Sequence, residues 1–183
     1  PIGCELAQAF RRLGARVTVR EMFAALGKDD PELALLVKQQ LRKDGVDLRE
    51  QVKILRVDAG AAGIAVILDD GGRETRIEGS ALLVAAGRRP NLDGLDLDAA
   101  GIAHTPRGVT IDRRLRTTNR RVFAIGDVAG PYQFTHMAGY HAGIVIRNAL
   151  FRLPAKVDYR AVPWVTFTAP ELDYVMYAEG EAM

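Results

Sequence analysis

The sequence has 183 residues, of which 48% are hydrophobic and 26% charged, and its formal net charge is +2. This composition is typical of a soluble globular protein with a buried core, and the length allows one large domain or two small ones. The arginine pairs are scattered with acids between them, which argues against a nucleic-acid groove; Arg113-Arg114 and Arg120-Arg121 are two of these pairs. The single cysteine excludes a disulfide framework or a dithiol centre within these residues.

The first predicted element is a helix followed by a strand. Gly14 stands where a C-terminal glycine ends a helix, and residues 16–19 read as a short β-branched strand that leads to Glu21. Arginines lie on the opposite side of this helix from its apolar positions. Those positions recur at helical spacing and are Ile2, Leu6, Phe10 and Leu13.

A second helix is predicted after Asp30, which fits an N-cap, with Pro31 at the first helical position and Gly45 as the stop. Its apolar stripe is Leu33, Leu36, Val37 and Leu41. Residues 46–60 and 63–72 then alternate like strands.

The run 81–86 is continuously apolar, which predicts a strand buried on both faces. After Gly87 the chain is rich in turn residues and reads as a linker. Two short strands are predicted near 109–111 and 122–125, and a helix over 137–151 follows. The helix has Ala138, Ala142, Val145 and Ala149 at helical spacing, and a further segment begins near Asp158.

The opening pattern suggests a dinucleotide site. A helix begins directly after Gly3, as after the last glycine of a phosphate-binding turn, and Glu21 lies about 20 residues further on, where an acid holds ribose hydroxyls. The first strand and the first two glycines of such a unit are not in the sequence. From these residues alone, a plain helix–strand unit with a surface glutamate is an equal alternative.

Three segments together carry a family resemblance: "PIGCELAQAFRRLGARVTVRE", "LLVAAGRRPNLDGLDL" and "TTNRRVFAIGDVAGPYQFTHMAGYHAG". In this order and spacing they resemble the flavin-dependent pyridine nucleotide–disulfide oxidoreductases, which include dihydrolipoamide dehydrogenase, glutathione reductase and mercuric reductase. The resemblance covers nearly the whole chain, and the later segments look most like the mercuric-reductase-like branch.

The resemblance implies a nucleotide site in the first half. Gly3 would face the pyrophosphate of NAD, and Glu5 would lie near the meeting point of nicotinamide and flavin. Glu21 would bind the adenosine ribose, Val52 would line the adenine side, and Gly87 would bring backbone close to the nicotinamide half. NAD is the expected nucleotide, with NADP as the alternative because Arg20 and Lys28 could favour a phosphate.

The resemblance implies FAD contacts in the second half. Asp127 would hydrogen-bond the ribityl chain, and Gly126 would let the backbone approach. The next segment would lie over the flavin, with the following helix offsetting negative charge on the reduced ring. Its residues are Gln133, Phe134, Thr135 and His136. No catalytic residue and no metal site are expected.

The implied fold is α/β: a Rossmann-like NAD-binding domain, three-layered with a β-meander and lacking its first strand, then the second part of an FAD domain and the start of an α+β dimerisation domain. The expected boundaries are 1–88, 89–157 and 158–183. Without its first strand, the helix face of Leu6 and Phe10 should be poorly covered.

The implied function is hydride transfer from NAD(P)H to FAD and then electron transfer to a disulfide or similar small acceptor. We expect the sequence to be a fragment of a longer, homodimeric enzyme and to be inactive by itself. Cys4 is expected to be a small buried residue. No membrane or nucleic-acid partner is expected, and the default compartment is the cytoplasm. The alternative is a nucleotide-binding or interaction module without redox activity.

Overall fold

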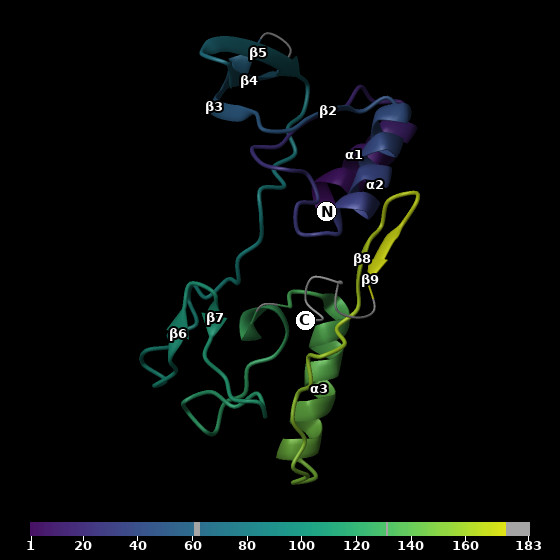
Figure 1. The fold of residues 1–183 in the computed structure, drawn as a ribbon. Coiled ribbons are helices and arrows are strands. Elements are labelled where there is room, and N and C mark those ends of the chain that lie inside the picture. The colour runs from purple at the N-terminus through teal and green to yellow at the C-terminus, as the bar shows by residue number, and fades with distance from the viewer. Residues whose placement is uncertain (61–62, 131, 175–183) are drawn as a thin grey trace. The chain divides into compact units, whose positions relative to one another are not determined.

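The computed structural model describes residues 1–60, 63–130 and 132–174, which form two compact units of mixed α/β structure (Figure 1). Unit 1 contains Pro1–Ala86 and the segment from Pro163 onward, and unit 2 contains Gly87–Val162. The domain boundaries expected from the sequence stay a prediction, and residues 175–183 of the last expected domain lie outside the described residues.

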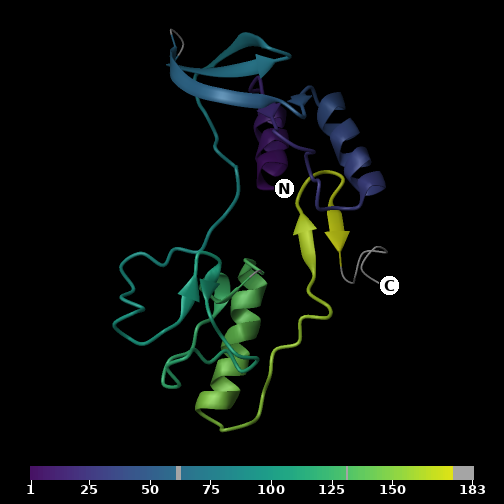
Figure 2. The same cartoon turned by 60° about the vertical axis from the view of Figure 1, so that its left-hand side comes forward.

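Two helices of unit 1, α1 (Ile2–Arg12) and α2 (Pro31–Lys43), lie side by side (Figure 2). At the end of α1, the Gly14 N–H donates to Arg11 O and the Ala15 N–H donates to Phe10 O, a pair of bonds that closes a helix when the residue after the cap is left-handed. Gly14 has φ +98°, so the predicted glycine stop is confirmed.

The predicted start of α2 is also confirmed. Oδ1 of Asp30 accepts hydrogen bonds from the backbone N–H groups of Glu32 at 2.9 Å and Leu33 at 3.1 Å. The cap satisfies two of the four amides that have no partner in the first turn.

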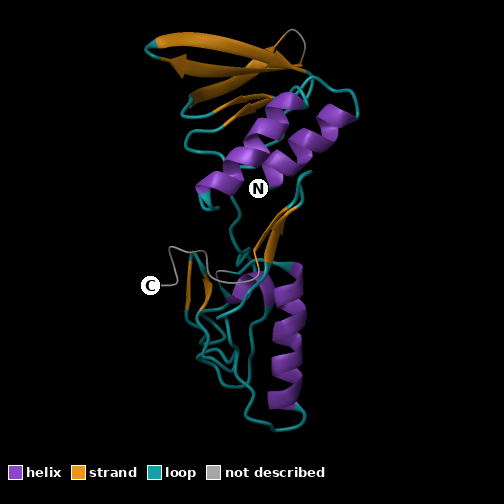
Figure 3. Cartoon of the chain, turned by 45° about the vertical axis from the view of Figure 1, so that its right-hand side comes forward, coloured by secondary structure: helices purple, strands orange, loops and turns teal. Residues whose placement is uncertain are grey.

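Three small sheets complete unit 1 (Figure 3). Strands β1 (Thr18–Arg20) and β2 (Asp47–Arg49) pair in parallel, with Val19 opposite Leu48. Strands β3 (Lys53–Gly60), β4 (Gly63–Asp70) and β5 (Arg73–Gly79) form the antiparallel meander that the resemblance implied. Strands β8 (Trp164–Thr166) and β9 (Leu172–Tyr174) form an antiparallel hairpin.

The buried face of α1 differs from the predicted one. The side chains that α1 buries are Cys4, Ala7 and Gln8, whereas Phe10 is 49% exposed and Leu13 82% exposed. A helix buries the side that meets its neighbours, and here those neighbours are α2, the parallel strands and the β8–β9 hairpin. Phe10 is therefore exposed rather than part of the core that the spacing predicted, while Leu6 on the same predicted face is half-buried.

The stripe predicted for α2 is half right. Val37 and Leu41 are buried, but Leu33 and Leu36 are exposed and Ala34 takes the remaining core position. A small residue at position 34 lets the helix approach the hairpin, since Ala34 and Tyr174 belong to the same core cluster.

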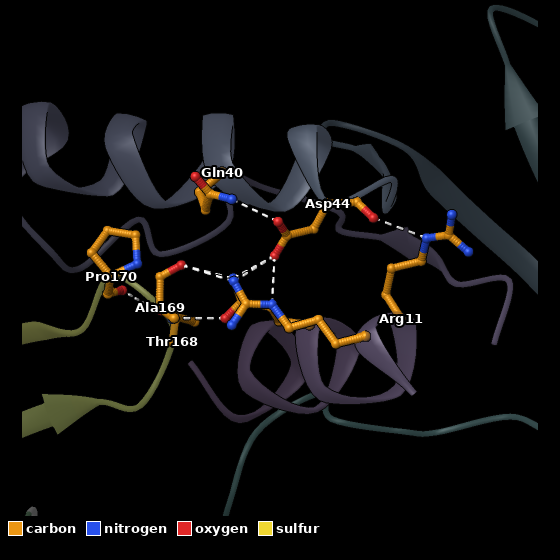
Figure 4. Close-up of polar contacts among 8 residues, drawn as sticks. Arg11, Gln40, Asp44, Thr168, Ala169 and Pro170 are labelled. Carbon is orange, nitrogen blue, oxygen red and sulfur yellow. Dashed lines mark hydrogen bonds and ion pairs between the residues drawn. The ribbon is translucent and has the colours of Figure 1, made fainter. Parts of the chain in front are cut away.

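A polar cluster joins α1, α2 and the turn before β9 (Figure 4). Asp44 accepts hydrogen bonds from Gln8 and Arg12 at 2.9 Å each and from Gln40 at 2.6 Å. The buried Gln8 also exchanges two hydrogen bonds with the backbone of Ala169. Burial alone would raise the pKa of Asp44, but these hydrogen bonds outweigh burial and lower it below its usual value.

The predicted strand over 81–86 is wrong. This segment has no regular structure, and its largest apolar side chains are exposed, with Val84 at 74%. A strand needs a neighbour for its backbone hydrogen bonds, and no strand of the described residues pairs with this segment.

Unit 2 contains the short hairpin of β6 (His104–Thr105) and β7 (Gly108–Val109), the 3-10 turn η1 (Gly126–Ala129) and the helix α3 (Thr135–Ala149). Its two core clusters centre on Val109 with Ala124 and on Leu115 with Ile144.

Three sequence predictions for unit 2 need correction. The strand predicted near 109–111 is reduced to β7, and the one near 122–125 provides only an isolated bridge between Phe123 and Arg116. Helix α3 begins at Thr135, and each side chain that it buries lies one position before a residue of the predicted stripe. These larger side chains fill the core, and they are Met137, His141, Ile144 and Asn148.

Candidate functional site

The parallel strands of unit 1 bring two predicted site residues together. Both strands end at the same edge, where the Glu21 N–H donates to Arg49 O at 3.1 Å and the Val52 N–H donates to Glu21 O at 3.0 Å. The two residues that the resemblance assigned to the adenosine half of a nucleotide are therefore neighbours at the carboxyl edge of a parallel pair, where ligands of α/β folds bind.

The Glu21 side chain lies in the turn after β1 and is half-buried. Its Oε1 accepts a hydrogen bond from the Phe23 N–H at 2.9 Å, which fixes the direction of the carboxylate. Arg20 forms an ion pair with Asp47, because its guanidinium donates a hydrogen bond to Asp47 Oδ2 at 2.6 Å. The positive charge beside Glu21 is thus paired within the sheet.

Sequence reasoning missed Glu50, which shapes the same edge. Its Oε1 accepts hydrogen bonds from the Ala25 N–H at 2.8 Å and from Lys38 at 3.1 Å, so it ties the loop after Glu21 to α2. Burial by itself would raise the pKa of Glu50. The hydrogen bonds and the Lys38 charge have the larger combined effect, so the pKa lies below its usual value. The sequence offered one signal for Glu50, namely its position directly after β2, at the same end of the strand pair as Glu21.

Gly3 and Glu5 lie in the first turn of α1. A Cβ on Gly3 would stand 3.3 Å from the Ala85 Cβ, so the glycine allows close approach of the segment before Gly87. The Glu5 carboxylate accepts the Phe167 N–H at 2.9 Å.

Cys4 is buried between these residues, as expected. Burial is the largest cause of its raised pKa, and the carboxylates of Glu21 and Glu5 add to the shift. A thiol in this state is a weak nucleophile.

In unit 2 the Gly126–Asp127 turn leads toward α3. Gly126 is buried at φ +66°, and a Cβ there would meet the Ala138 Cβ at 3.1 Å. The next side chain, Asp127, is half-exposed and has one Arg88 nitrogen 3.8 Å from its Oδ2. The same Arg88 nitrogen donates to the Gln133 carbonyl at 2.7 Å.

Arg88, which follows the predicted Gly87, thus connects Asp127 with Gln133. Gly87 itself is exposed at φ +120° with open space where a Cβ would stand.

The segment after Gln133 forms the start of α3. Phe134 is the N-cap residue, and Thr135 and His136 stand exposed in the first turn. The rings of Phe134 and His136 stack with centroids 5.3 Å apart. This arrangement offers an aromatic pair and the positive end of a helix dipole in the segment that Arg88 links to Asp127.

His141 holds the Gly126 turn from within α3. Its Nδ1 accepts the Gly126 N–H at 3.1 Å, and its Nε2 lies 3.0 Å from the Tyr159 hydroxyl. Because a backbone N–H only donates, Nδ1 is unprotonated and Nε2 carries the proton of the neutral ring. His141 therefore has a structural role, and only the folded chain, not the spacing of the two residues in the sequence, shows that it positions the Gly126 turn.

We expect acid to destabilise unit 2 through His141. Burial lowers its pKa below the usual 6.5, so the unfolded chain takes up a proton first as the pH falls through that value. The free energy of unfolding should then decrease by up to about 1.4 kcal/mol per pH unit. Denaturant unfolding of wild type and His141→Gln at neutral and mildly acidic pH measures this slope.

The exposed His136→Gln variant is the matched control and should keep the wild-type slope. A slope that survives in His141→Gln would assign the acid sensitivity to another group.

No group of three or more His, Cys, Asp or Glu side chains is placed to hold a metal ion in residues 1–60, 63–130 and 132–174. In the same part of the chain, no helix has the length and apolar character needed to cross a membrane.

Comparison with known proteins places these features in a family. Residues 1–142 match the family profile described as pyridine nucleotide-disulphide oxidoreductase. The chain is 37% identical to a mercuric reductase of Staphylococcus aureus over 183 residues, covering 99% of this chain and 34% of the relative. It is 34% identical to a dihydrolipoyl dehydrogenase of Bacillus subtilis, covering 99% of this chain and 39% of the relative.

Solved structures give the same result. The Cu(II) complex of the HOCl-induced flavoprotein disulfide reductase RclA from Escherichia coli superposes with a TM-score of 0.88 at 30% identity, covering 99% of this chain and 42% of that one. LpdA from Mycobacterium tuberculosis superposes with a TM-score of 0.87 at 28% identity, covering 98% and 39%. The chain therefore spans well under half the length of these relatives.

Proposed function

This chain belongs to the pyridine nucleotide-disulphide oxidoreductase family, and we propose that it provides the nicotinamide-nucleotide edge and the flavin-contacting turn of an enzyme that transfers hydride from NAD(P)H to FAD. The observation that carries the proposal is the turn of Gly126 and Asp127, held by His141 and joined by Arg88 to the start of α3. The electrons then pass to a disulfide or a similar small acceptor.

The residues present fit FAD. The Asp127 carboxylate is half-exposed and its contact with Arg88 is 3.8 Å long, so it is available to accept hydrogen bonds from ribityl hydroxyls. The first turn of α3 presents amides that favour negative charge. FAD, when bound, supplies the hydride acceptor, and the turn orients it.

The residues of unit 1 fit NAD. Glu21 offers a carboxylate at the carboxyl edge of the parallel strands, and such a group accepts hydrogen bonds from ribose hydroxyls and repels a 2′-phosphate. Arg20 is paired with Asp47, which leaves it a poor phosphate ligand. We therefore propose NADH as the reductant, with NADPH as the weaker alternative.

The acceptor step needs groups outside these 183 residues. Their one cysteine, Cys4, is buried and has a raised pKa, so a dithiol would have to come from elsewhere in a longer polypeptide. We propose that the 183 residues alone are inactive, that the whole enzyme is a cytoplasmic homodimer, and that the β8–β9 hairpin begins its dimerisation domain.

Steady-state assays of the full-length protein with FAD test this function. NADH oxidation should depend on FAD and on an added acceptor, and oxidised lipoamide, a low-molecular-weight disulfide, mercuric ion and a quinone form the acceptor panel. A protein that binds nucleotide but oxidises no NADH with any acceptor would favour a nucleotide-binding module without redox activity.

Replacing Glu21 by alanine should weaken NADH binding by roughly 10- to 100-fold, because a hydrogen bond to a charged group contributes about 1.5–3 kcal/mol. NADPH binding should change much less, since the carboxylate repels the 2′-phosphate. Fluorescence titration with both nucleotides measures the two constants.

The control for Glu21→Ala is Glu78→Ala, which removes a carboxylate from the exposed surface of β5. Equal weakening of NADH and NADPH by Glu21→Ala would show that Glu21 does not select the ribose.

A further inference from the structure

We propose that unit 2 carries a binding site for a small anion with two or more phosphate groups, separate from the flavin-contacting turn. The site, called the cavity below, is an open surface pocket of about 470 Å³ near the end of α3. Five of the residues that line it are arginines: Arg114, Arg116, Arg120, Arg121 and Arg152. None of its lining residues belongs to the segment 126–136, so the inference does not depend on the flavin proposal.

The sequence separates these arginines, and the fold gathers them. Two come from the turn around Leu115, two from the turn before Phe123, and Arg152 follows α3. Leu115 is fully buried in the core of unit 2 and has φ +65°, which fixes the turn that carries its two arginine neighbours. The sequence predicted scattered arginine pairs, but on the surface around this cavity the fold brings five arginines together.

The positive charge in the cavity has no acidic partner among the described residues. No aspartate or glutamate lines the cavity, and none of the five guanidinium groups forms an ion pair there. Asp112 is the nearest acid in sequence, and its Oδ1 accepts the backbone N–H groups of Arg114 and Arg116. By contrast, Arg12, Arg20 and Arg56 each pair with a carboxylate.

Arg116 is the most constrained of the five. Its guanidinium carbon lies 5.8 Å from the centre of the Phe123 ring, and its Nε is buried without a hydrogen-bond partner in the described residues. A buried donor left without a partner is unfavourable, because it has lost its hydrogen bonds to water. An anion beside this guanidinium would compensate its charge.

The far wall of the cavity is held in place by Asn148. Its Nδ2 donates to Ile144 O at 3.0 Å and to Ala155 O at 2.8 Å, which ties the segment around Arg152 to the last turn of α3. Arg152 itself has φ +55°, a left-handed position that a non-glycine residue seldom adopts. The carbonyl end of α3 contributes only about half a negative charge, far less than five guanidinium groups carry.

The chemistry of the wall selects the ligand. A guanidinium group binds phosphate oxygens through two parallel hydrogen bonds. The five guanidinium groups together carry more positive charge and more donors than a single carboxylate ligand could neutralise and bind. The volume of about 470 Å³ is open to solvent and leaves room for a small anion. A compact anion with two or three linked phosphates fits both the charge and the space.

Isothermal titration of the FAD-loaded, full-length protein with sodium tripolyphosphate tests the site, with no free nucleotide present, because FAD and NAD⁺ each carry two phosphates and would compete for it. The double variant Arg120→Gln/Arg152→Gln should weaken binding at least tenfold, because each lost charge-assisted contact contributes about 1.5–3 kcal/mol. Arg107→Gln, an exposed arginine of unit 2 outside the cavity, is the matched control and should bind as wild type does.

Three outcomes would overturn the proposal: no saturable binding to wild type, equal weakening by Arg107→Gln, or tighter binding of a single-stranded oligonucleotide that the double variant abolishes. Circular dichroism and thermal unfolding of each variant separate a lost site from a lost fold. If the double variant unfolds, the single variant Arg120→Gln gives the same comparison.

Discussion

Replacing Asp127 by alanine is expected to weaken flavin binding by roughly 10- to 100-fold, because hydrogen bonds to a charged acceptor contribute about 1.5–3 kcal/mol. The side chain is half-exposed and its nearest cation, Arg88, stands 3.8 Å away, so its loss should disturb little else in unit 2. Titration of flavin fluorescence with the full-length apoprotein measures the affinity.

Two variants sharpen the Asp127 experiment. Asp127→Asn keeps the shape of the side chain but loses its charge, so its flavin affinity should lie between those of wild type and Asp127→Ala. Asp98→Ala removes a side chain of unit 2 that is 97% exposed and should bind flavin normally. A dissociation constant for Asp127→Ala within twofold of wild type would remove Asp127 from the flavin site.

Replacing Gly126 by alanine is expected to lower the free energy of unfolding by about 2–3 kcal/mol and to abolish tight flavin binding. A side chain at left-handed φ costs about 1–2 kcal/mol. The new Cβ would also stand 3.1 Å from the Ala138 Cβ in a buried turn. Urea denaturation of wild type and variant measures the loss.

Gly101 provides a close control for this substitution. It has φ +67°, against +66° for Gly126, but nothing stands within 4 Å of its missing Cβ. Gly101→Ala should therefore show the backbone cost alone. If the two variants lose equal stability, then the packing of the Gly126 turn against α3 is not what requires glycine.

Local signals in the sequence predicted the ends of elements well. Asp30 and Gly14 act through hydrogen bonds to residues within one turn, so their effect does not depend on the rest of the fold. The meeting of Glu21 and Val52 at one edge has a different origin, since the family resemblance assigned both residues to the nucleotide site and no signal within one turn joins them.

Buried faces were predicted poorly because they depend on what covers a helix. Spacing alone favoured Phe10 in α1 and Ala138 in α3, while the core took Ala7 and Met137. The run 81–86 illustrates the same limit, because an apolar segment becomes a strand only beside a partner with free backbone groups.

The residues that sequence reasoning missed act over long separations. His141 binds the amide of Gly126, Arg88 reaches Gln133, and Glu50 binds the amide of Ala25. None of these pairs forms a recognisable motif, and only the folded chain brings them together. The arginines around the cavity of unit 2 belong to the same class of observation.

Anaerobic titration of the FAD-loaded, full-length protein with NADH tests most directly whether this chain serves a nicotinamide–flavin pair. We predict that NADH bleaches the absorption band of the oxidised flavin, and that Glu21→Ala needs a higher NADH concentration for the same bleaching. An oxidised flavin spectrum that neither NADH nor NADPH changes would contradict the proposed function.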